Sequence, residues 1–438
     1  LSIIVDEKTP HALPNMDFKI MQGNSLIPTF DGKFVNLVDK LRHVHSSKIR
    51  DAKKKLSGLQ QLFYDAVGEY KLELLIQIKY LILEIVKLQM DFEYKQEVEN
   101  NAESLNLFSQ ETAKEVKLDE EKRRIVGMCL KMQHDLSSAS KSIEDKASME
   151  LPFFDWKIMF PNVFNEQGFD IVIGNPPYFV YQESHVGEIA DIRRDNDYKI
   201  AFGGKLNAYK LFLANALEKL LKPDGICSFI FQNSFLGDRQ ATILRKHVLE
   251  NKTILNIDSF PERDSKKKRV FESVKMSVCI VLIQNTLSES SYRFNVDIWD
   301  NKYKSSGLNT NFSYAEISQI DSVDYTIPRL RPEYKSLIIK LLKRKEINIQ
   351  CIEGELNVTF HKQYFTQNSS FPTILKGASI QKYYYTLQMS QGQIDYLDVE
   401  NYAKKYGNTE KSKHHACERI AMQGMTGAND KIRLVMSI

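Results

Sequence analysis

Cysteine is scarce in this chain, and no two cysteines lie close enough to form a CxxC pair. The five cysteines are far apart in the sequence, which excludes a disulfide-stabilised scaffold and a zinc ribbon and predicts a reducing, cytoplasmic location. Long apolar runs are also missing. A membrane-spanning helix needs about 18 or more consecutive apolar residues, so we expect no membrane association.

The chain has little excess charge of either sign. Its net charge of +4 at pH 7 is only weakly basic, so any interaction with nucleic acid must depend on local clusters of cations. The length of 438 residues, with 42% hydrophobic residues, predicts two to four domains with ordinary apolar cores. Wholesale disorder is excluded.

Proline is absent between Pro28 and Pro152, which favours long helices in that stretch. Apolar residues recur there at spacings of three and four, first from Leu74 to Phe92 and again from Ile125 to Leu136. This pattern predicts an antiparallel helical hairpin within residues 39–150. The alternative interpretation of the apolar seam is a coiled coil that dimerises the protein.

After residue 150 the pattern changes to short apolar runs separated by helical segments, which is typical of an α/β sheet. Residues 169–174 are predicted to be a buried strand, and residues 226–231 form the next strand after a helix that ends near Leu220. Such a strand-helix-strand unit is a parallel crossover. Two further strands are expected at residues 254–257 and 278–283.

The most informative residues are Asn175, Pro176, Pro177 and Tyr178, directly after the first of these strands. Reactive groups in α/β sheets collect at the carboxyl ends of strands. The prolines fix the backbone and remove two donors, leaving the Asn175 side-chain oxygen and the Pro176 carbonyl as acceptors for an amino group. Tyr178 offers a ring for stacking on a base. These features suit methylation of an amino nitrogen on a nucleobase that is flipped out of the helix.

The motif and its strand resemble the catalytic motif of TaqI-like DNA adenine-N6 methyltransferases, as found in type IIG restriction-modification and phage-defence proteins. The resemblance implies a partial Rossmann-like methyltransferase sheet with a long helical insertion and a C-terminal α+β target-recognition domain. It implies S-adenosylmethionine as the cofactor and double-stranded DNA with a flipped adenine as the partner. The implied domains are residues 1–38 (cofactor-adenine block), 39–150 (insertion), 151–288 (catalytic part) and 289–438 (linker and partial recognition domain).

Further segments match the family in order. Asn24 and Ser25 lie in a segment that resembles the block contacting the cofactor adenine. Phe271 matches an aromatic residue that packs against the flipped base, although it is equally typical of a core phenylalanine. Four consecutive cations precede it, and they are candidates for contacts with DNA phosphates or for an ordinary solvated loop. They are Lys266, Lys267, Lys268 and Arg269.

One part of the family pattern is absent: no GxG turn for the cofactor precedes Asn24. We therefore expect the chain to begin inside the methyltransferase domain. The alternative function is an inactive DNA-binding specificity fragment, and methylation of RNA or of a protein glutamine uses similar turns. No metal site is predicted, because His414, His415 and Cys417 lack a matching ligand pair. Mg²⁺ would be needed only by a nuclease domain upstream.

Overall fold

The computed structural model describes residues 18–34, 46–103, 112–289, 291–342, 356–381, 384–387, 393–407, 409, 421–422 and 436–437. The chain divides into two compact units, Leu1–Lys345 and Glu346–Ile438, and each is considered by itself. Among the helices of the described ranges, none combines the length and apolar character needed to cross a membrane.

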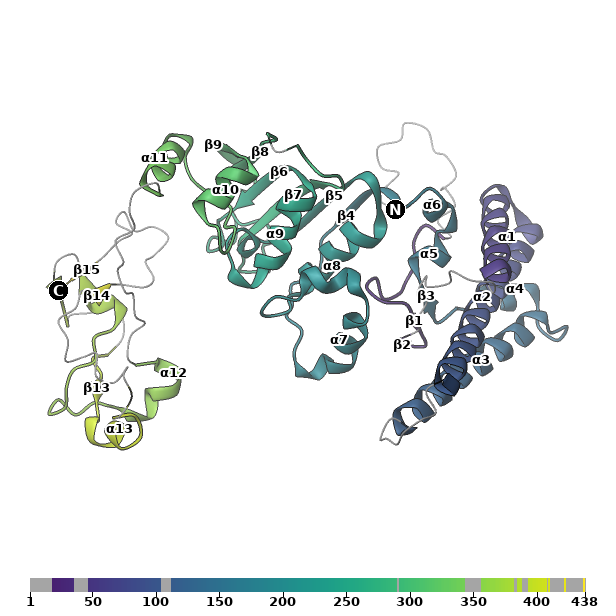
Figure 1. Ribbon diagram of the computed structural model, residues 1–438, viewed down its shortest axis with the longest axis horizontal. Helices are drawn as coiled ribbons and strands as arrows, with labels where there is room; N and C mark the ends of the chain where they lie inside the picture. Colours follow the sequence, from purple (N-terminus) through teal and green to yellow (C-terminus); the bar gives the residue numbers. More distant parts are fainter. Residues whose placement is uncertain are drawn as a thin grey trace. The chain divides into compact units, whose positions relative to one another are not determined.

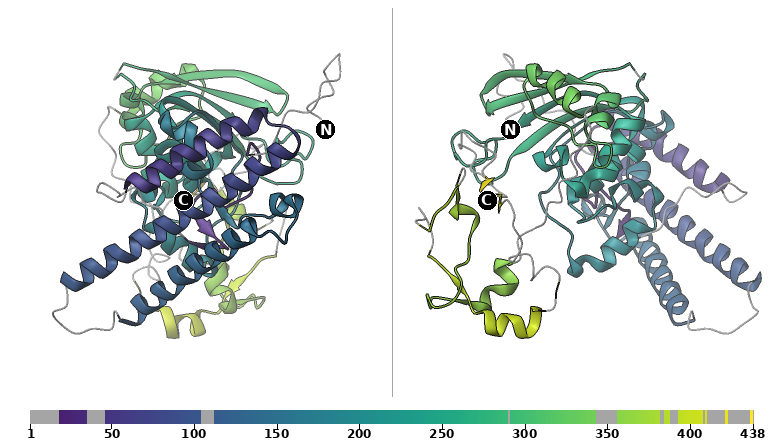
Figure 2. Two further views of the ribbon diagram at one scale, coloured as in Figure 1. Left: turned by 90° about the vertical axis from the view of Figure 1, so that its right-hand side faces the viewer. Right: turned by 60° about the vertical axis from the view of Figure 1, so that its left-hand side comes forward.

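The first unit contains three long helices, α1 (Ser46–Asp65), α2 (Gly68–Glu103) and α3 (Thr112–Ser137), followed by the short α4 (Ile143–Ser148). Helices α2 and α3 lie side by side as a hairpin (Figure 2). The predicted seam is buried, with Ile78 and Ile85 fully inaccessible and Ile125 only 1% exposed. The predicted helical hairpin is thus confirmed. Helix α1 was not predicted; it packs on α2 in the same apolar core.

The insertion leaves and re-enters the domain at one small antiparallel sheet. Its strands are β1 (Thr29–Phe30), β2 (Lys33–Phe34) and β3 (Phe153–Phe154), in the order β2-β1-β3. Strand β1 precedes the long helices and β3 follows them, so their pairing closes the base of the insertion. Gly23 is required beside this sheet because a Cβ there would lie 2.1 Å from the Cβ of Phe154.

A six-stranded mixed sheet forms the centre of the first unit (Figure 1), with the order β4-β5-β7-β6-β8-β9. The pairs β4·β5 and β6·β8 are parallel, and the other pairs are antiparallel. The α/β fold class is confirmed. The strands are β4 (Phe169–Gly174), β5 (Leu221–Gln232), β6 (Thr253–Phe260), β7 (Val278–Gln284), β8 (Phe294–Asn301) and β9 (Lys304–Phe312).

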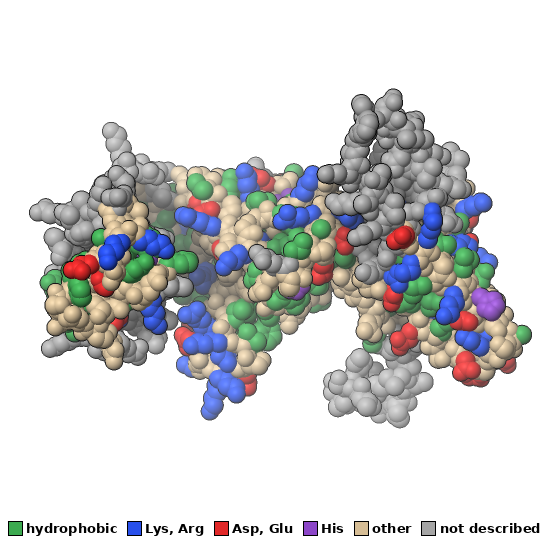
Figure 3. All heavy atoms as spheres, turned by 90° about the horizontal axis from the view of Figure 1, so that it is seen from below, with side chains coloured by type: hydrophobic (Ala, Val, Ile, Leu, Met, Phe, Trp, Pro, Cys, Tyr) green, Lys and Arg blue, Asp and Glu red, His purple; other side chains and the backbone are tan. Residues whose placement is uncertain are grey.

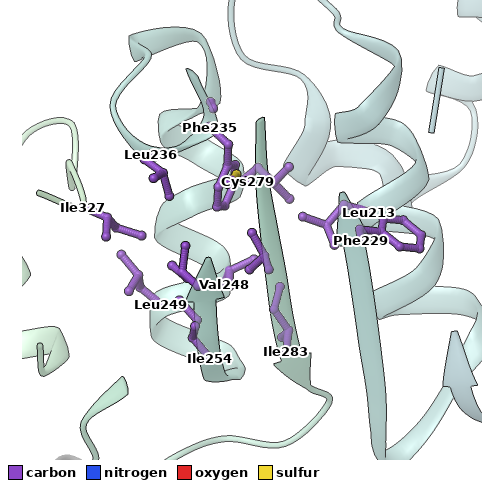
Figure 4. Packing of buried hydrophobic residues seen from close by; sticks show 14 of the residues in the cluster. Leu213, Phe229, Phe235, Leu236, Val248, Leu249, Ile254, Cys279, Ile283 and Ile327 are labelled. Carbon is purple, nitrogen blue, oxygen red and sulfur yellow. The ribbon is translucent and has the colours of Figure 1, made fainter. Parts of the chain in front are cut away.

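Helices α8 (Ala208–Asn215) and α9 (Thr242–Asn251) cover one face of this sheet. Helix α8 continues as a π-helical turn, Ala216–Leu220. Leu213 from α8 and Val248 from α9 point into the same layer of side chains as Phe229 and Ile283 from the strands (Figure 4). Burying such side chains stabilises the fold by about 1.5–3 kcal/mol each, so this layer holds the sheet and the two helices together.

The opposite face of the sheet is open at β4, and here the prediction of a buried strand is wrong. Ile171 and Ile173 are 59% and 78% exposed. They alternate with Val172, which faces the helices, because successive side chains in a strand point to opposite faces. Strand β4 is also the edge strand of the sheet. An apolar run predicts a strand, but its position at an uncovered edge decides the exposure.

The predicted boundary between residues 288 and 289 falls between β7 and β8, two strands of one sheet, whereas the chain divides into its units at Lys345. The remaining helices of the first unit are α5 (Trp156–Met159), α6 (Pro161–Asn165), α7 (Val186–Arg193), α10 (Tyr314–Ile320) and α11 (Pro332–Leu342).

The second unit is built from short elements. They are α12 (Val358–His361), β10 (Phe365–Thr366), β11 (Ile380–Gln381), β12 (Tyr384–Tyr385), β13 (Tyr396–Leu397), α13 (Val399–Tyr406), β14 (Ala421–Met422) and β15 (Met436–Ser437). Rings of Tyr364, Tyr402 and Tyr406 pack together with His361. These short helices and strands agree with the α+β class that was predicted for the C-terminal region.

Candidate active site

The double-proline turn leaves the sheet at the end of β4 and is accessible. Pro176 is buried, whereas Asn175 and Pro177 are exposed. Within the described ranges the Asn175 side chain forms no hydrogen bond, so both its oxygen and its nitrogen are available to a ligand. The chain after the turn is fixed to the start of α8, because the Ala208 N–H donates to the Phe179 carbonyl at 3.0 Å.

Tyr178 is the last residue of the double-proline motif. Its ring is half-buried, and its hydroxyl donates to the Ile230 carbonyl at 3.3 Å. Burial raises the pKa of Tyr178 to about 12, so the hydroxyl remains protonated at neutral pH. The ring centroid lies 5.8 Å from that of Phe271, with 59° between the ring planes. The two residues that were predicted to flank a base are therefore neighbours.

The sheet register explains why these two rings meet. Phe271 lies in the connection between β6 and β7. Phe260, the last residue of β6, and Gln232, the last residue of β5, both pair with Val278, the first residue of β7. Strand β4 runs parallel to β5, so its following turn emerges at the same edge. The topology thus brings the turn and the β6–β7 connection together.

The four predicted phosphate contacts divide into two kinds. Lys266, Lys267 and Lys268 are exposed and extend into solvent. Arg269 instead turns into its own loop, where its guanidinium donates to the Arg263 carbonyl at 3.3 Å and to the Glu272 carbonyl. Figure 3 shows Lys and Arg side chains grouped on one protruding part of the surface. The lysines are the better candidates for contact with phosphate.

Asn24 and Ser25 are held in local structure. The Asn24 side-chain oxygen accepts from the backbone N–H groups of Leu26 (2.9 Å) and Ile27 (3.3 Å). The Ser25 carbonyl accepts from Trp156 Nε1 and Asn215 Nδ2, both at 2.9 Å. The Asn24 oxygen is therefore engaged by its own turn. The cofactor role of Asn24 and Ser25 stays a prediction.

One polar link beside the turn was missed by the sequence analysis. Glu188 of α7 accepts from Asn24 Nδ2 and from the Tyr181 hydroxyl, each at 3.4 Å. It therefore connects the Asn24 turn to the chain that follows the double proline. An isolated glutamate in a short helix carries no sequence signal for such a contact. In the described part of the chain no three acidic, histidine or cysteine side chains form a metal-binding group; His414, His415 and Cys417 lie outside the described residues.

Residues 66–266 match the family described as Eco57I restriction-modification methylase. The resemblance to type IIG restriction-modification methylases is confirmed. The matched segment runs from the helical hairpin through the double-proline turn to the first cations of the β6–β7 connection, so it contains the whole turn, whereas Phe271, Asn24 and Ser25 lie outside it.

Individual relatives are similar at low identity. The modification methylase CviBIII of Paramecium bursaria Chlorella virus NC1A is 26% identical over 46% of this chain and 48% of its own length. The type II restriction enzyme and methyltransferase RM.Eco57I of Escherichia coli is 22% identical over 48% of this chain and 22% of its own. Among solved structures, the type IIG restriction endonuclease BpuSI is similar with a TM-score of 0.30 and 13% identity, over 56% of this chain and 32% of that one. The chain spans less than half the length of these relatives.

Proposed function

We propose that this chain supplies the catalytic part of a site-specific DNA methyltransferase in a restriction-modification or phage-defence system. The reaction is transfer of a methyl group from S-adenosylmethionine to the N6 amino group of adenine in duplex DNA. The observation that carries the proposal is the position of the Tyr178 and Phe271 rings beside an accessible Asn175 that has no partner in the described ranges.

The residues of the turn act on the amino group. The Asn175 oxygen and the Pro176 carbonyl accept its two hydrogens, which favours a tetrahedral nitrogen whose lone pair is no longer delocalised into the ring. Tyr178 and Phe271 hold the extruded base by contact with its faces and offset the stacking lost in the duplex. The restricted backbone of Pro176 and Pro177 keeps both acceptors in position, so little reorganisation accompanies the reaction.

A second candidate is an inactive DNA-binding specificity fragment that retains the base pocket. Two observations favour it for the chain alone. The Asn24 oxygen is occupied by its own turn, and the apolar face of β4 that carries Ile171 and Ile173 is uncovered. Transfer by this chain together with a cofactor-binding segment supplied upstream of it, but not by the chain alone, would assign the missing activity to that segment.

The test is methyl transfer by the full-length protein. Labelled methyl from S-adenosylmethionine is followed into genomic DNA, and the modified nucleoside is identified by mass spectrometry. We expect N6-methyladenine, and we expect Asn175→Ala to abolish it. Asn165→Ala, at an exposed asparagine that ends α6, is the matched control and should retain activity. Label in RNA or protein but not in DNA, or unchanged transfer by Asn175→Ala, would overturn the proposal.

A further inference from the structure

The hairpin formed by β8 and β9 ends at the same edge of the sheet as the Tyr178 and Phe271 rings. Strand β8 is parallel to β6, and Ser259 near the end of β6 pairs with Ile298 near the end of β8. The hairpin tip therefore extends past the same edge of the sheet as the β6–β7 connection that carries Phe271. Register shifts at Trp299 mark bulges directly before the tip, and bulges of this kind redirect the end of a strand.

Two contacts fix the tip to that connection. The backbone N–H of Lys302 donates to the Lys268 carbonyl at 3.0 Å, and the Lys302 ammonium pairs with Glu272 at 2.9 Å. Glu272 follows Phe271 in the chain, and Phe271 contacts Tyr178. A continuous series of contacts thus links the hairpin tip to the double-proline turn.

The residue at the tip is an exposed aromatic. Tyr303 is 78% exposed, while its backbone N–H donates to the Asn301 side chain at 2.9 Å and the Lys302 ammonium lies 5.0 Å from its ring centroid. Below the tip, Trp299 stacks on Phe260 at 5.2 Å and donates to Asp258 at 2.9 Å. A large ring is thus held out in solvent on a well-fixed turn.

The charge around this ring is strongly positive. Residues 261–277 and 300–304 together contain eight Lys and Arg residues and four Asp and Glu residues, so these two short segments alone carry an excess of four, which equals the net charge of the whole chain. Cations around an exposed ring match the phosphates and bases of a nucleic acid. An exposed tyrosine that only covered Lys302 would not require this surrounding charge.

We propose that the tip of the β8–β9 hairpin contacts duplex DNA next to the extruded base, with Tyr303 stacking on the bases that remain in the helix and the exposed Lys304 close to a phosphate. This inference rests on the proposed function, because the place of the contact is defined by base extrusion. The ring would stabilise the gap that the base leaves, so extrusion and binding would both depend on it.

The experiment uses the full-length protein and a duplex with 2-aminopurine at the methylated position, once sequencing of methylated DNA has located it. Fluorescence reports extrusion, and anisotropy of a labelled duplex reports affinity. We expect Tyr303→Ala to lower affinity about 5- to 150-fold and to reduce the fluorescence increase. Tyr303→Phe should restore both because the ring, not the hydroxyl, makes the contact. Tyr70→Ala, at a 52% exposed tyrosine of α2, is the matched control and should change neither.

The outcomes separate the two proposals. If Asn175→Ala abolishes methylation while Tyr303→Ala leaves affinity and fluorescence unchanged, the hairpin inference is overturned and the proposed function stands. If Asn175→Ala methylates normally, the proposed function fails whatever Tyr303 does. Equal loss in Tyr303→Ala and Tyr303→Phe would also overturn a stacking role.

Discussion

The rings of Tyr178 and Phe271 lie 5.8 Å apart, although one follows β4 and the other lies between β6 and β7. The ring planes are tilted by 59°, so the two rings are not stacked face to face. Neither ring is fully buried. Two partly exposed rings lie beside an asparagine whose side chain has no hydrogen-bond partner among the described residues, and they provide faces for a third planar group, which is what the capture of a base requires.

Tyr178→Ala and Phe271→Ala should each weaken capture of the extruded adenine by about 1–3 kcal/mol through lost stacking. Tyr178→Phe should weaken this capture by less, about 0.5–1.5 kcal/mol, because it keeps the ring and removes only the hydrogen bond to the Ile230 carbonyl. The measurement is 2-aminopurine fluorescence at the target position. Loss of thermal stability in Phe271→Ala with normal fluorescence would instead make Phe271 an ordinary core residue.

Substitution of the lysines in the β6–β7 connection should change the salt dependence of DNA binding. Three lysines are tested: Lys266, Lys267 and Lys268. For each one that contacts a phosphate, replacement by alanine should reduce the magnitude of the slope of log K against log salt by about 0.9. Arg269→Ala should act differently, because its guanidinium holds the Arg263 and Glu272 carbonyls. We expect it to raise cleavage of this loop in limited proteolysis. An unchanged slope in the triple lysine variant would support the solvated-loop alternative.

The features that local pattern determines were predictable. Apolar spacing identified the hairpin seam at Ile78 and Ile125, and an apolar run followed by two prolines identified β4 and its turn. The proximity of Tyr178 to Phe271 was predicted from the family resemblance, since no local pattern relates them.

The features that depend on long-range pairing were not predictable. Exposure of Ile171 and Ile173 follows from the place of β4 at the sheet edge, and the extension of the sheet past residue 288 follows from the pairing of β8 with β6. The difference between Arg269 and its neighbouring lysines depends on which carbonyls its loop presents. Composition cannot distinguish these cations, because all four are equally typical of a solvated segment.

Arg245 should be essential for stability rather than for binding. It is fully buried in α9, and its guanidinium donates to the Phe235 carbonyl at 2.6 Å, the Tyr325 carbonyl at 2.9 Å, and the carbonyls of Asp238 and Asp324. Arg245→Met leaves several buried carbonyls without donors and should cost about 3 kcal/mol or more in the free energy of unfolding. Arg239→Met is the matched control, because Arg239 pairs with Asp324 at the surface and should contribute only about 0–1 kcal/mol. Urea unfolding measures both, and equal effects would contradict a special role for the buried guanidinium.

Lys210 should make stability depend on pH in the alkaline range. Its side chain is buried in α8, and its ammonium donates to the Gly203 carbonyl at 2.6 Å and the Gln240 carbonyl at 2.9 Å. Burial lowers the pKa of Lys210 to about 8, from 10.5. Between these two values the unfolded chain binds more protons than the folded chain, so the contribution of this residue to stability rises with pH from about 8 to about 10.5.

The measurement is urea unfolding of the wild type and of Lys210→Met across that window. Other lysines and tyrosines titrate there too, so the informative quantity is the difference between the two unfolding free energies. The substitution Lys210→Met removes two hydrogen bonds, which destabilises the fold. It also removes the cost of burying a charge, which stabilises the fold, and only this cost changes with pH. The stability of the wild type relative to the variant should therefore increase as the pH rises. A constant difference across the window would mean that Lys210 has the same pKa in the folded and unfolded states.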